Sequence, residues 1–558
     1  MQDNNRVKIS FAQNLEIEDK FYYKGITPLQ VIEKEKISSD TIIVAAKINN
    51  ELKNLKTSIF EDCKLSFVDL SSPEGVRIYS YSLSFVLVRA VKELYDNAKI
   101  VIKHSLSNGL YGEIYSRFLL TAHDAEKISE RMKKIIEQDS EFEIINIRRT
   151  GAIRIFKRNN QLDKVRLLEF LSDDNITIYK NDIYYDYYNE LLVPSTGYLK
   201  KFELRYYPPG VILRYPDFRT PGEIPPFVNQ VHLFNIFNEY ERWGQILNID
   251  SVSAINEKVR DFKITEMIRV AEALHEKKIV YIADKIEGLK KRIKLILISG
   301  PSASGKTTFA KRLSIHLKVN GMHPVSISLD DYFVDRDKTP LDENGEHNFE
   351  DLHAIDIELV NQNLIDLFAG KEVEIPKFSF TKGKREKKGQ YLKISPDQVI
   401  LIEGIHGLND ELTSEIDREN KFKIYVSALT HLNIDDHNRI ATNDNRIIRR
   451  IVRDSQFRAH STLDTIRRWE SVRKGEEKYV FPFQEEVDVM FNSVLVYELG
   501  VLRRYAIPLL KEIDNSVSEY SEAQRLIRLL SYFKDIPEEE IPRNSIIREF
   551  ISGSGFNY

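Results

Sequence analysis

The spacing of apolar residues predicts strands and helices along the chain, in two different arrangements. In the first part, alternating apolar and polar positions at 7–11 and 41–45 predict strands. Thr27 followed by Pro28 predicts a helix start between them, because proline is well tolerated at the first helical position. Strands around one short helix predict a small β-grasp fold, and helical spacing at 84–94 opens a further α+β region.

The second half reads as buried strands that alternate with helices. Short runs rich in apolar residues predict strands at 295–298, 325–329, 399–402 and 423–426. After Thr307, apolar residues at helical spacing share one face of a helix that Gly321 ends: Phe309, Leu313 and Leu317. We therefore expect an α/β domain with a parallel sheet and flanking helices, preceded by α+β domains.

The turn between the first of these strands and its helix carries a phosphate-binding pattern. Gly300-x-x-x-x-Gly305-Lys306-Thr307 fits G-x-x-x-x-G-K-[ST]. Glycine permits backbone angles that let successive N–H groups turn toward an anion. Lys306 brings a cation to the β- and γ-phosphates, and the Thr307 hydroxyl suits a Mg²⁺ ligand. We expect ATP to be bound by the loop and the first helical turn: Gly300, Pro301, Ser302, Ala303, Ser304, Gly305, Lys306, Thr307 and Thr308.

Carboxylates follow two other predicted strands. Asp330 and Asp331 end one strand, and Glu403 ends another. Acidic residues at the carboxyl ends of parallel strands lie where α/β proteins bind their ligands. Asp330 is placed to accept a proton from an attacking hydroxyl, and Glu403 to hold Mg²⁺. The alternative for the aspartate pair is a turn cap.

Arginines gather on one face of a later helix. They fall at i, i+3, i+4 and i+7, with isoleucine and valine on the other face: Arg446, Arg449, Arg450 and Arg453. Like charges at this spacing repel, so an anionic partner such as a transferred phosphoryl group is expected. The alternative is a solvated charged face. Arg458, in the polar stretch that follows, is expected in a mobile lid that excludes water.

These features together resemble uridine kinases and their relatives, over roughly residues 293–500. Ile402-Glu403-Gly404-Ile405 is similar to a family strand that ends in Phe-Glu-Gly-Ile. The segment 444–454 matches the family helix D-x-R-x-x-R-R-x-x-R-D residue for residue. The resemblance implies that Asp330 is the base toward a nucleoside 5′-hydroxyl. It also implies a set of residues that act on the phosphates during transfer: Lys306, Arg446, Arg449 and Arg453.

The acceptor-binding segments depart from that family. Where uridine kinases carry F-D-H-P-D-A-F-D, this chain has Phe-Glu-Asp-Leu-His-Ala-Ile-Asp at 349–356. Glu350 can still accept two hydroxyl hydrogen bonds, although its longer arm shifts them. The family's base-reading Tyr and His align with Phe378 and Gly383, and a site without such polar contacts does not strongly reject the wrong base. The resemblance implies these acceptor-site residues: Asp330, Glu350, Phe378, Arg446 and Arg458.

The first part of the chain, up to about residue 225, resembles a different family. Tyr-Lys-Gly-Ile-Thr-Pro-Leu-Gln-Val-Ile at 23–32 looks like the TGS domain that opens threonyl-tRNA synthetases. Residues 81–114 and 186–194 resemble the editing-type domain that comes next. The family's hydrolytic pocket is lined by two His, a Cys and a further His, whose positions here hold Tyr81, Phe85, Tyr188 and Leu192. Without an imidazole, editing chemistry is not expected. The two-part arrangement looks like the long bacterial uridine kinase-like proteins.

Three remaining features each have two interpretations. The stretch 198–217 interleaves basic and aromatic residues, which suits RNA binding, although sheet residues with tyrosine on the core side are the favoured interpretation. The basic loop 382–388 suits phosphates or RNA, and a solvated hairpin tip is favoured. His104 is expected to be a structural residue, because a metal site needs further ligands.

The composition of the chain argues against several other classes of protein. Lys+Arg 81 against Asp+Glu 85 gives a net charge of −4, which argues against a globally basic nucleic-acid binder. The single cysteine, Cys63, excludes an intramolecular disulfide and a Cys-based zinc site. The start lacks the apolar stretch of a signal peptide, and no apolar run approaches the roughly 20 residues of a membrane span. We expect a cytoplasmic protein without a membrane partner.

We expect five regions along the chain. They are a β-grasp domain (1–68), an editing-like domain (69–226), a helical connector (227–290), a uridine kinase-like domain (291–515) and a helical tail (516–558). The tail carries an amphipathic helix at 519–533 and a short helix at 545–551, which pack on the kinase core or on a partner copy. We expect a homo-oligomer.

The sequence predicts an ATP- and Mg²⁺-dependent phosphotransferase that acts on the hydroxyl of a small molecule. A nucleoside is the favoured acceptor. One alternative is a kinase of another hydroxylated metabolite, which the altered acceptor segments permit. A second is an RNA-binding regulator that uses nucleotide hydrolysis as a switch. Against the second, the chain has no Asn-Lys-x-Asp guanine-reading signature and its net charge is negative.

Overall fold

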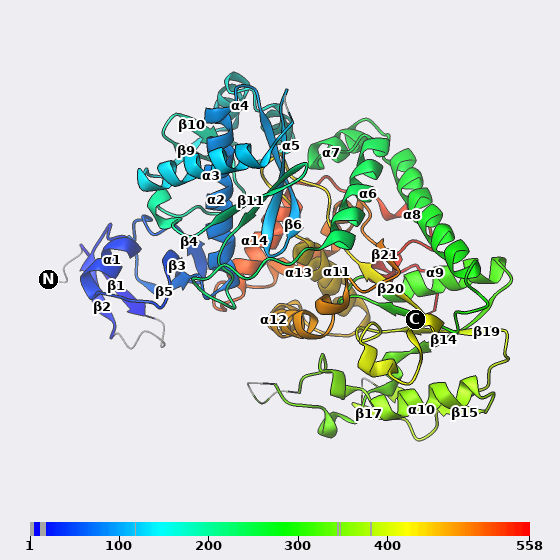
Figure 1. Cartoon of the computed structure of the whole chain (residues 1–558). Coiled ribbons are helices and arrows are strands. Elements are labelled where there is room, and N and C mark those ends of the chain that lie inside the picture. The colour runs from blue at the N-terminus through cyan, green and yellow to red at the C-terminus, as the bar shows by residue number, and fades with distance from the viewer. Residues whose placement is uncertain are drawn as a thin grey trace.

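The computed structural model describes residues 5–11, 18–117, 119–342, 345, 347–379 and 382–557. We call residues 5–226 the front half and residues 227–557 the back half. Figure 1 shows the front half at the left, in blue and cyan, and the back half with its parallel sheet at the right. Helix α14 (Tyr520–Ser531), near the C-terminus, reaches back to the front half and contacts its strand β4 (Glu51–Lys53).

The first sheet has the predicted β-grasp arrangement. Its order is β2-β1-β5-β3-β4, in which β1 and β5 are parallel and the other neighbours antiparallel. Helix α1 begins where predicted: the Thr27 side chain accepts from the Gln30 N–H, and Pro28 is the first helical residue. The elements are β1 (Arg6–Phe11), β2 (Lys20–Tyr23), α1 (Pro28–Glu35), β3 (Ile43–Ile48), β4 (Glu51–Lys53) and β5 (Cys63–Asp69).

A four-stranded sheet, β11-β12-β7-β6, and a three-stranded sheet, β10-β9-β8, complete the front half. Helix α2 is buried on most sides because it packs against β3, β5, α3 and β6. The elements are α2 (Pro73–Leu94), β6 (Lys99–Leu106), β7 (Gly109–Tyr115), α3 (Ala122–Glu137), β8 (Glu143–Arg148), α4 (Arg149–Arg158), α5 (Leu162–Phe170), β9 (Asn175–Asn181), β10 (Tyr184–Asp186), β11 (Glu203–Tyr207) and β12 (Gly210–Arg214).

Three consecutive helices lead from the front half to the parallel sheet. They are α6 (Val231–Leu247), α7 (Val252–Arg260) and α8 (Ile264–Glu287). The predicted apolar stripe of α8 lies in the core, with Met267 and Ala271 buried and Val270 and Leu274 partly buried. Helix α8 packs along α9 at the outer side of the sheet.

The back half is built on a five-stranded sheet in the order β14-β19-β13-β20-β21, in which every neighbouring pair is parallel. This confirms the predicted fold class. The register places Glu403 beside Ile298 of β13 and beside Ser328 of β14, so the carboxyl ends of three strands meet at one edge. The elements are β13 (Leu295–Ser299), α9 (Lys306–Val319), β14 (His323–Ser328), β19 (Gln398–Glu403), β20 (Lys421–Ser427) and β21 (Val489–Asn492).

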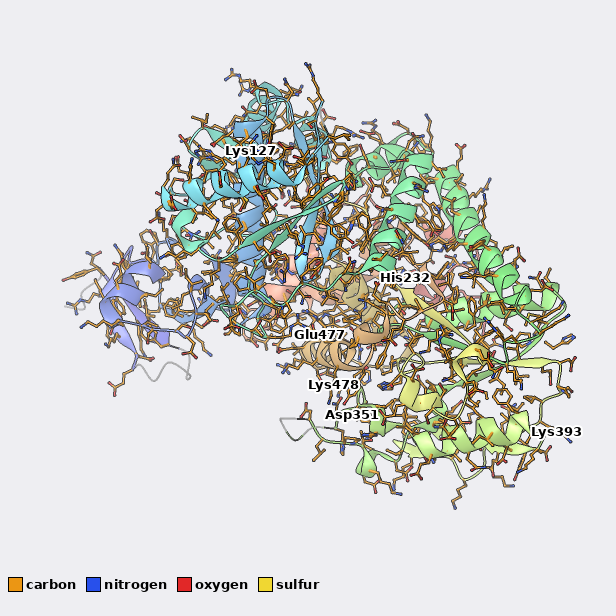
Figure 2. All side chains as sticks on the ribbon, viewed as in Figure 1. Lys127, His232, Asp351, Lys393, Glu477 and Lys478 are labelled. Atoms are coloured by element: carbon orange, nitrogen blue, oxygen red, sulfur yellow. The ribbon has the colours of Figure 1, made fainter. Side chains whose placement is uncertain are left out.

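A small lobe is inserted between β14 and β19. It contains α10 (Ile357–Phe368), β15 (Val373–Ile375), β16 (Phe378–Ser379), β17 (Lys384–Arg385) and β18 (Gln390–Leu392). Figure 2 shows Asp351 of this insertion close to Glu477 and Lys478 of α12 (Thr462–Tyr479). The neighbouring Tyr479 hydroxyl donates to the Asp351 carboxylate, so the lobe and α12 face each other across the edge where the strands end.

The remaining helices cover the sheet and its edge. They are α11 (Thr442–Phe457), α13 (Glu498–Lys511), α14 (Tyr520–Ser531) and α15 (Arg548–Ile551). The predicted amphipathic tail helix is α14, whose Leu526, Leu529 and Leu530 are buried, and it packs on α13 of the same chain. The second predicted tail helix is shorter than expected, because only its last four residues are helical. None of the helices in the described ranges is long and apolar enough to cross a membrane.

Candidate active site

A turn bounded by glycines connects β13 to α9. Ala303 and Gly305 have positive φ angles of 57° and 81°, a conformation that glycine adopts at little cost. A Cβ atom on Gly300 would lie 1.8 Å from the Val426 carbonyl oxygen, so only glycine fits where the turn passes β20. The turn ends at the N-terminus of α9, where backbone N–H groups and the helix dipole favour an anion. We call residues 300–308 the phosphate loop.

Lys306 lies inside the phosphate loop and close to carboxylates. Its Nζ donates to the carbonyl oxygens of Gly300 (2.9 Å) and Pro301 (3.0 Å). Burial lowers the pKa of Lys306, and the charges of Glu403 and Asp330 act in the opposite direction. A lysine in this position meets the β- and γ-phosphates of a bound nucleoside triphosphate.

Thr307 and Glu403 fit a Mg²⁺ ion beside the lysine. Thr307 Oγ1 donates to Glu403 Oε1 over 3.3 Å. Burial and the charge of Asp330 raise the pKa of Glu403 to about 7, and a divalent cation would favour its ionised form. Within the described residues, no group of three His, Cys, Asp or Glu side chains could hold a metal alone.

Asp330 faces the same space from the end of β14. It lies in the 3-10 helix Leu329–Tyr332, where Ser328 Oγ accepts from its N–H at 3.3 Å. Its charge acts on the pKa values of both Lys306 and Glu403, which places its carboxylate among them. The strand ends therefore bring together the predicted lysine, metal ligand and base, which are far apart in the sequence.

Arg446 lies buried under the phosphate loop. Its Nε donates to the Ser302 carbonyl oxygen at 3.0 Å, and its Nη2 pairs with Glu476 of α12. Its guanidinium also stacks over the Trp469 ring, 5.1 Å from the centroid. Glu476 Oε1 accepts in addition from the Ser302 N–H at 2.7 Å, so both residues fix the same loop position.

Arg449 is fully buried on the other side of the phosphate loop. Its Nε and Nη2 form a bidentate pair with Glu498, at 2.8 and 2.7 Å. Its remaining hydrogens go to Ala303 O at 3.2 Å and to Ser493, whose Oγ and carbonyl oxygen each accept at 3.0 Å. The solvated face that was the alternative for this helix is therefore wrong for these two arginines. Their part in catalysis stays a prediction.

The other arginines of α11 lie nearer to solvent. Arg450 donates from Nη1 to Ser302 Oγ at 2.9 Å, a further contact to the phosphate loop. Arg453 pairs with Asp454 at 2.7 Å, and the Arg458 side chain is 50% exposed. The charge of Arg453 lowers the pKa of Arg458, so the two guanidinium groups are neighbours.

Glu350 lies on the acceptor side of the site, against α12. A Cβ atom on Gly475 would lie 2.3 Å from the Glu350 Cβ, so the close approach requires glycine there. Burial raises the pKa of Glu350 to about 7, with the charge of Glu476 as the next cause. The charge of Lys306 acts in the opposite direction and lowers this pKa.

Phe378 and its neighbours form the apolar wall of the lobe. The Phe378 ring packs on Phe333, with centroids 5.7 Å apart, and it is buried. Its N–H donates to Asp331 Oδ1 over 3.4 Å. Asp331 thus contacts β16 of the lobe, 47 residues further along the chain, and this contact is not the local turn cap of the alternative interpretation.

The basic loop 382–388 differs from the favoured solvated tip at one residue. Arg385 donates from Nε to the Phe333 carbonyl oxygen and from Nη2 to that of Tyr332, both at 2.9 Å. Its Nη1 pairs with Asp356 at 3.0 Å. The acceptors lie at the end of the 3-10 turn Leu329–Tyr332, and an arginine has several donors that reach them together.

Sequence patterns missed three carboxylates that contact the phosphate loop or its arginines. They are Glu476 and Glu498, described above, and Glu549, which accepts from the Thr308 N–H and hydroxyl. None lies in a motif, and their partners are between 30 and 241 residues away. Only the tertiary fold brings them to the loop.

Aromatic rings fill the place of the hydrolytic pocket in the front half. Tyr81 and Tyr188 meet edge to face with centroids 5.9 Å apart, and Phe85 lies 5.7 Å from Tyr188. Phe85, Tyr188 and Leu192 are all buried. These positions therefore belong to the core of the front half.

A buried ion cluster joins the two halves next to this aromatic core. Lys164 is fully buried, and its Nζ lies 3.1 Å from both Asp186 and Asp435. His437 Nδ1 approaches Asp186 Oδ2 at 2.7 Å. Lys164 and Asp186 come from the front half, while Asp435 and His437 lie in the segment between β20 and α11. The charges of a buried cluster compensate one another, so each is costly to remove alone.

The same segment, residues 429–441, makes further contacts with the front half. Asn433 Nδ2 donates to the Ile102 carbonyl oxygen at 2.6 Å, and the Ile102 N–H donates to Asp436 O at 2.8 Å. The Tyr81 hydroxyl donates to Arg439 O at 3.4 Å. Because this segment leads directly into α11, the front half positions the arginine helix.

The basic and aromatic stretch 198–217 is engaged within the fold. The Tyr206 hydroxyl donates to Leu120 O at 3.0 Å, and Arg214 is buried and paired with Glu203. This agrees with the favoured interpretation as sheet residues. His104 is buried as well, and burial lowers its pKa well below the ordinary value, as expected of a structural histidine.

Residues 295–499 match the sequence model of the Phosphoribulokinase / Uridine kinase family. The matched range contains the phosphate loop, Asp330, Glu403 and helix α11. The resemblance of this part of the chain to uridine kinases is confirmed.

The N-terminal region is similar to threonine–tRNA ligases, which confirms the second resemblance. The ligase of Prochlorococcus marinus (strain MIT 9515) is 30% identical over 186 residues, which cover 33% of this chain and 29% of the ligase. That of Thermotoga petrophila is 33% identical over 189 residues, with the same coverage of 33% and 29%. The chain therefore spans less than a third of the length of these relatives.

Two solved structures align with the back half at low scores. A possible uridine kinase from Bacillus stearothermophilus is 22% identical, covers 39% of this chain and 98% of that chain, and gives a TM-score of 0.27. D-glycerate 3-kinase from Cryptococcus neoformans var. grubii is 14% identical over 45% and 87% of the two chains, with a TM-score of 0.21. Likenesses of this size carry no argument about chemistry.

Proposed function

We propose that the chain is an ATP- and Mg²⁺-dependent phosphotransferase whose acceptor is the 5′-hydroxyl of a nucleoside. The observation that carries the proposal is the convergence of Lys306, Asp330 and Glu403 at the carboxyl edge of one parallel sheet. Phosphoryl transfer to a hydroxyl needs a cradle for the phosphates, a ligand for the cation and a base for the proton. The family match over residues 295–499 supports the same reaction class.

Asp330 takes the proton of the acceptor hydroxyl. As the hydroxyl oxygen forms its bond to the γ-phosphorus, the bond to the β,γ-bridging oxygen breaks and ADP leaves. Lys306 and the N–H groups of the phosphate loop hold the β- and γ-phosphates. Thr307 and Glu403 would hold Mg²⁺, which neutralises phosphate charge when bound.

The arginines divide into two roles. Arg453 and Arg458, which lie nearer to solvent, stabilise the charge of the phosphoryl group during transfer. Arg446, Arg449 and Arg450 are positioning residues, because each donates to Ser302 or Ala303 of the phosphate loop. Their contribution is a rigid cradle.

The residues of the proposed acceptor site suit a hydroxylated small molecule, but they do not specify a nucleobase. Glu350 offers carboxylate oxygens to a pair of hydroxyl groups. Phe378 is buried against Phe333 and offers no polar contact to a base. A kinase of another hydroxylated metabolite is therefore the second candidate, and sugar phosphates and pantothenate belong in the substrate panel.

The test is ADP release by the full-length protein across a nucleoside and metabolite panel, with Asp330→Asn as control. We expect release that depends on one acceptor and falls by about 10²–10⁴-fold in the variant, the usual effect of losing a general base. Acceptor-dependent release that survives in Asp330→Asn would remove Asp330 as base. Hydrolysis that needs no acceptor, together with retention of tRNA in a filter-binding titration of the full-length chain, would favour the RNA-binding regulator.

A further inference from the structure

The C-terminal segment places a carboxylate on the phosphate loop. Thr308 directly follows the Gly305-Lys306-Thr307 end of the loop motif and is fully buried. Glu549 Oε2 accepts from the Thr308 N–H at 3.0 Å and from its Oγ1 at 2.6 Å. Glu549 belongs to α15, beyond the range that matches the kinase family model.

Thr308 presents donors of the kind that a nucleotide phosphate uses. The N–H groups at the start of this helix point at the bound anion, and in a phosphate loop they cradle the α- and β-phosphates. A carboxylate carries charge of the same sign as a phosphate and offers oxygen acceptors of the same kind. One pair of donors cannot serve the carboxylate and a phosphate at the same time.

The backbone that carries Glu549 is fixed in place. Ile546, Ile547 and Phe550 are fully buried, and the Phe550 ring lies 4.9 Å from the Arg449 guanidinium. Ile546 lies directly on the loop, since a Cβ atom on Gly305 would come within 2.6 Å of its Cγ2. Glu549 itself is only half-buried, so its side chain can turn away while the segment stays packed.

The charge of Glu549 also reaches the reacting end of the site. It acts on the pKa values of Lys306, Glu403 and Lys311. An additional negative charge beside the loop repels the phosphate groups that bind there. The carboxylate therefore opposes nucleotide binding by occupying donors and by repulsion.

We propose that Glu549 is an internal competitor of the nucleotide: its carboxylate holds the α-phosphate end of the loop until a nucleotide displaces it. This regulation rests on the proposed function only in that the loop binds a nucleoside triphosphate. The contact orders the loop before a nucleotide binds, and it raises the concentration of ATP that is needed to occupy the loop.

The test is the dissociation constant of ADP and of ATP, measured by titration calorimetry on the full-length protein without an acceptor. Glu549→Gln keeps the size and an acceptor oxygen but removes the charge. Glu540→Gln is the matched control, because Glu540 is exposed in the same C-terminal segment. Charge-assisted hydrogen bonds are about 1 kcal/mol stronger than neutral ones, so we expect roughly five-fold tighter binding of both nucleotides for Glu549→Gln and no change for Glu540→Gln.

Thermal unfolding of the nucleotide-free protein separates the competitor from a simple helix cap. A cap alone predicts a lower melting temperature for Glu549→Gln with an unchanged or weaker nucleotide affinity, and this result would overturn the inference. Lys306→Ala tests the function independently. If nucleotide binds to the wild type and is lost in Lys306→Ala, while Glu549→Gln binds like the wild type, the inference fails and the function stands. If neither the wild type nor Glu549→Gln binds nucleotide, both fail.

Discussion

Replacement of Arg449 by methionine tests whether the arginine helix supports the phosphate loop from below. Arg449 has no exposed surface, and all of its hydrogen-bond partners lie in the protein: Glu498, Ser493 and Ala303. Methionine has a similar length and fills most of the space, so the loss of packing is small. The main effect is a buried Glu498 without its cation.

The size of the effect follows from that uncompensated charge. Removal of one partner of a buried ion pair costs about 3–5 kcal/mol, against a total stability of about 5–15 kcal/mol for a typical domain. Arg449→Met should therefore unfold the back half at a clearly lower temperature or urea concentration. Arg449→Met combined with Glu498→Gln removes both charges and should recover much of this loss of stability. If the two sites were independent, the losses of the two single variants would add up instead.

Arg453→Met is the matched comparison, because its side chain is partly exposed and pairs only with the adjacent Asp454. We expect a stability change below about 1 kcal/mol and a lower kcat, since we propose that this arginine stabilises the phosphoryl group during transfer. Urea unfolding followed by circular dichroism and steady-state ADP release give both quantities. If Arg449→Met unfolds like the wild type and yet loses kcat, Arg449 contacts the substrate and the positioning role is refuted.

Three further predictions concern ionisation, the junction of the halves and the loop. The folded pKa of Glu403 is raised to about 7 from 4.5, so stability contributed by its protonated form is lost as pH rises between these values. Glu403→Gln cannot ionise, so its melting curves should lack this loss of roughly 3 kcal/mol. Lys164→Met removes the cation beside Asp186 and Asp435 and should cost about 3–5 kcal/mol of stability in urea unfolding. An unchanged free energy of unfolding would contradict the assignment of charge to this cluster. Gly305→Ala, at a φ of 81° and within 2.6 Å of Ile546, should abolish nucleotide binding in calorimetry; wild-type affinity would contradict the close packing.

The parts of the site that could be predicted are those encoded locally or by strand direction. The strand, glycine turn and helix at 295–319 are contiguous, so one motif specifies them. Asp330 and Glu403 are distant in sequence, but both follow buried strands, and parallel strands bring their carboxyl ends to one edge. The sequence is therefore sufficient to place Lys306, Asp330 and Glu403 at one edge of the sheet.

The partners of the arginine helix could not be predicted in the same way. The spacing of Arg446 and Arg449 shows that they share a helix face but contains no information on what that face meets. Their partners Glu476 and Glu498 lie 30 and 49 residues away, in elements without a motif. The same reason hides Glu549, whose contact to Thr308 spans 241 residues.

The acceptor segments illustrate a different limit. The pattern identified Phe378 and Glu350 as candidate substrate contacts but not that Phe378 is buried against Phe333. Arg385 donates to the Phe333 and Tyr332 carbonyl oxygens, 52 and 53 residues earlier in the chain, so a run of basic residues alone predicted solvent exposure. A run of charged residues in the sequence does not indicate which distant carbonyl oxygens it contacts in the fold.

The most direct test of the account follows the γ-phosphate itself. Full-length protein is incubated with Mg²⁺ and ATP labelled at the γ-phosphorus in the presence of a nucleoside panel, and the labelled products are separated by chromatography. The account predicts label on a nucleoside 5′-monophosphate, with formation reduced by about 10²–10⁴-fold in Asp330→Asn. Label that appears only as inorganic phosphate, at the same rate with and without acceptors, would contradict a kinase that transfers to a hydroxyl.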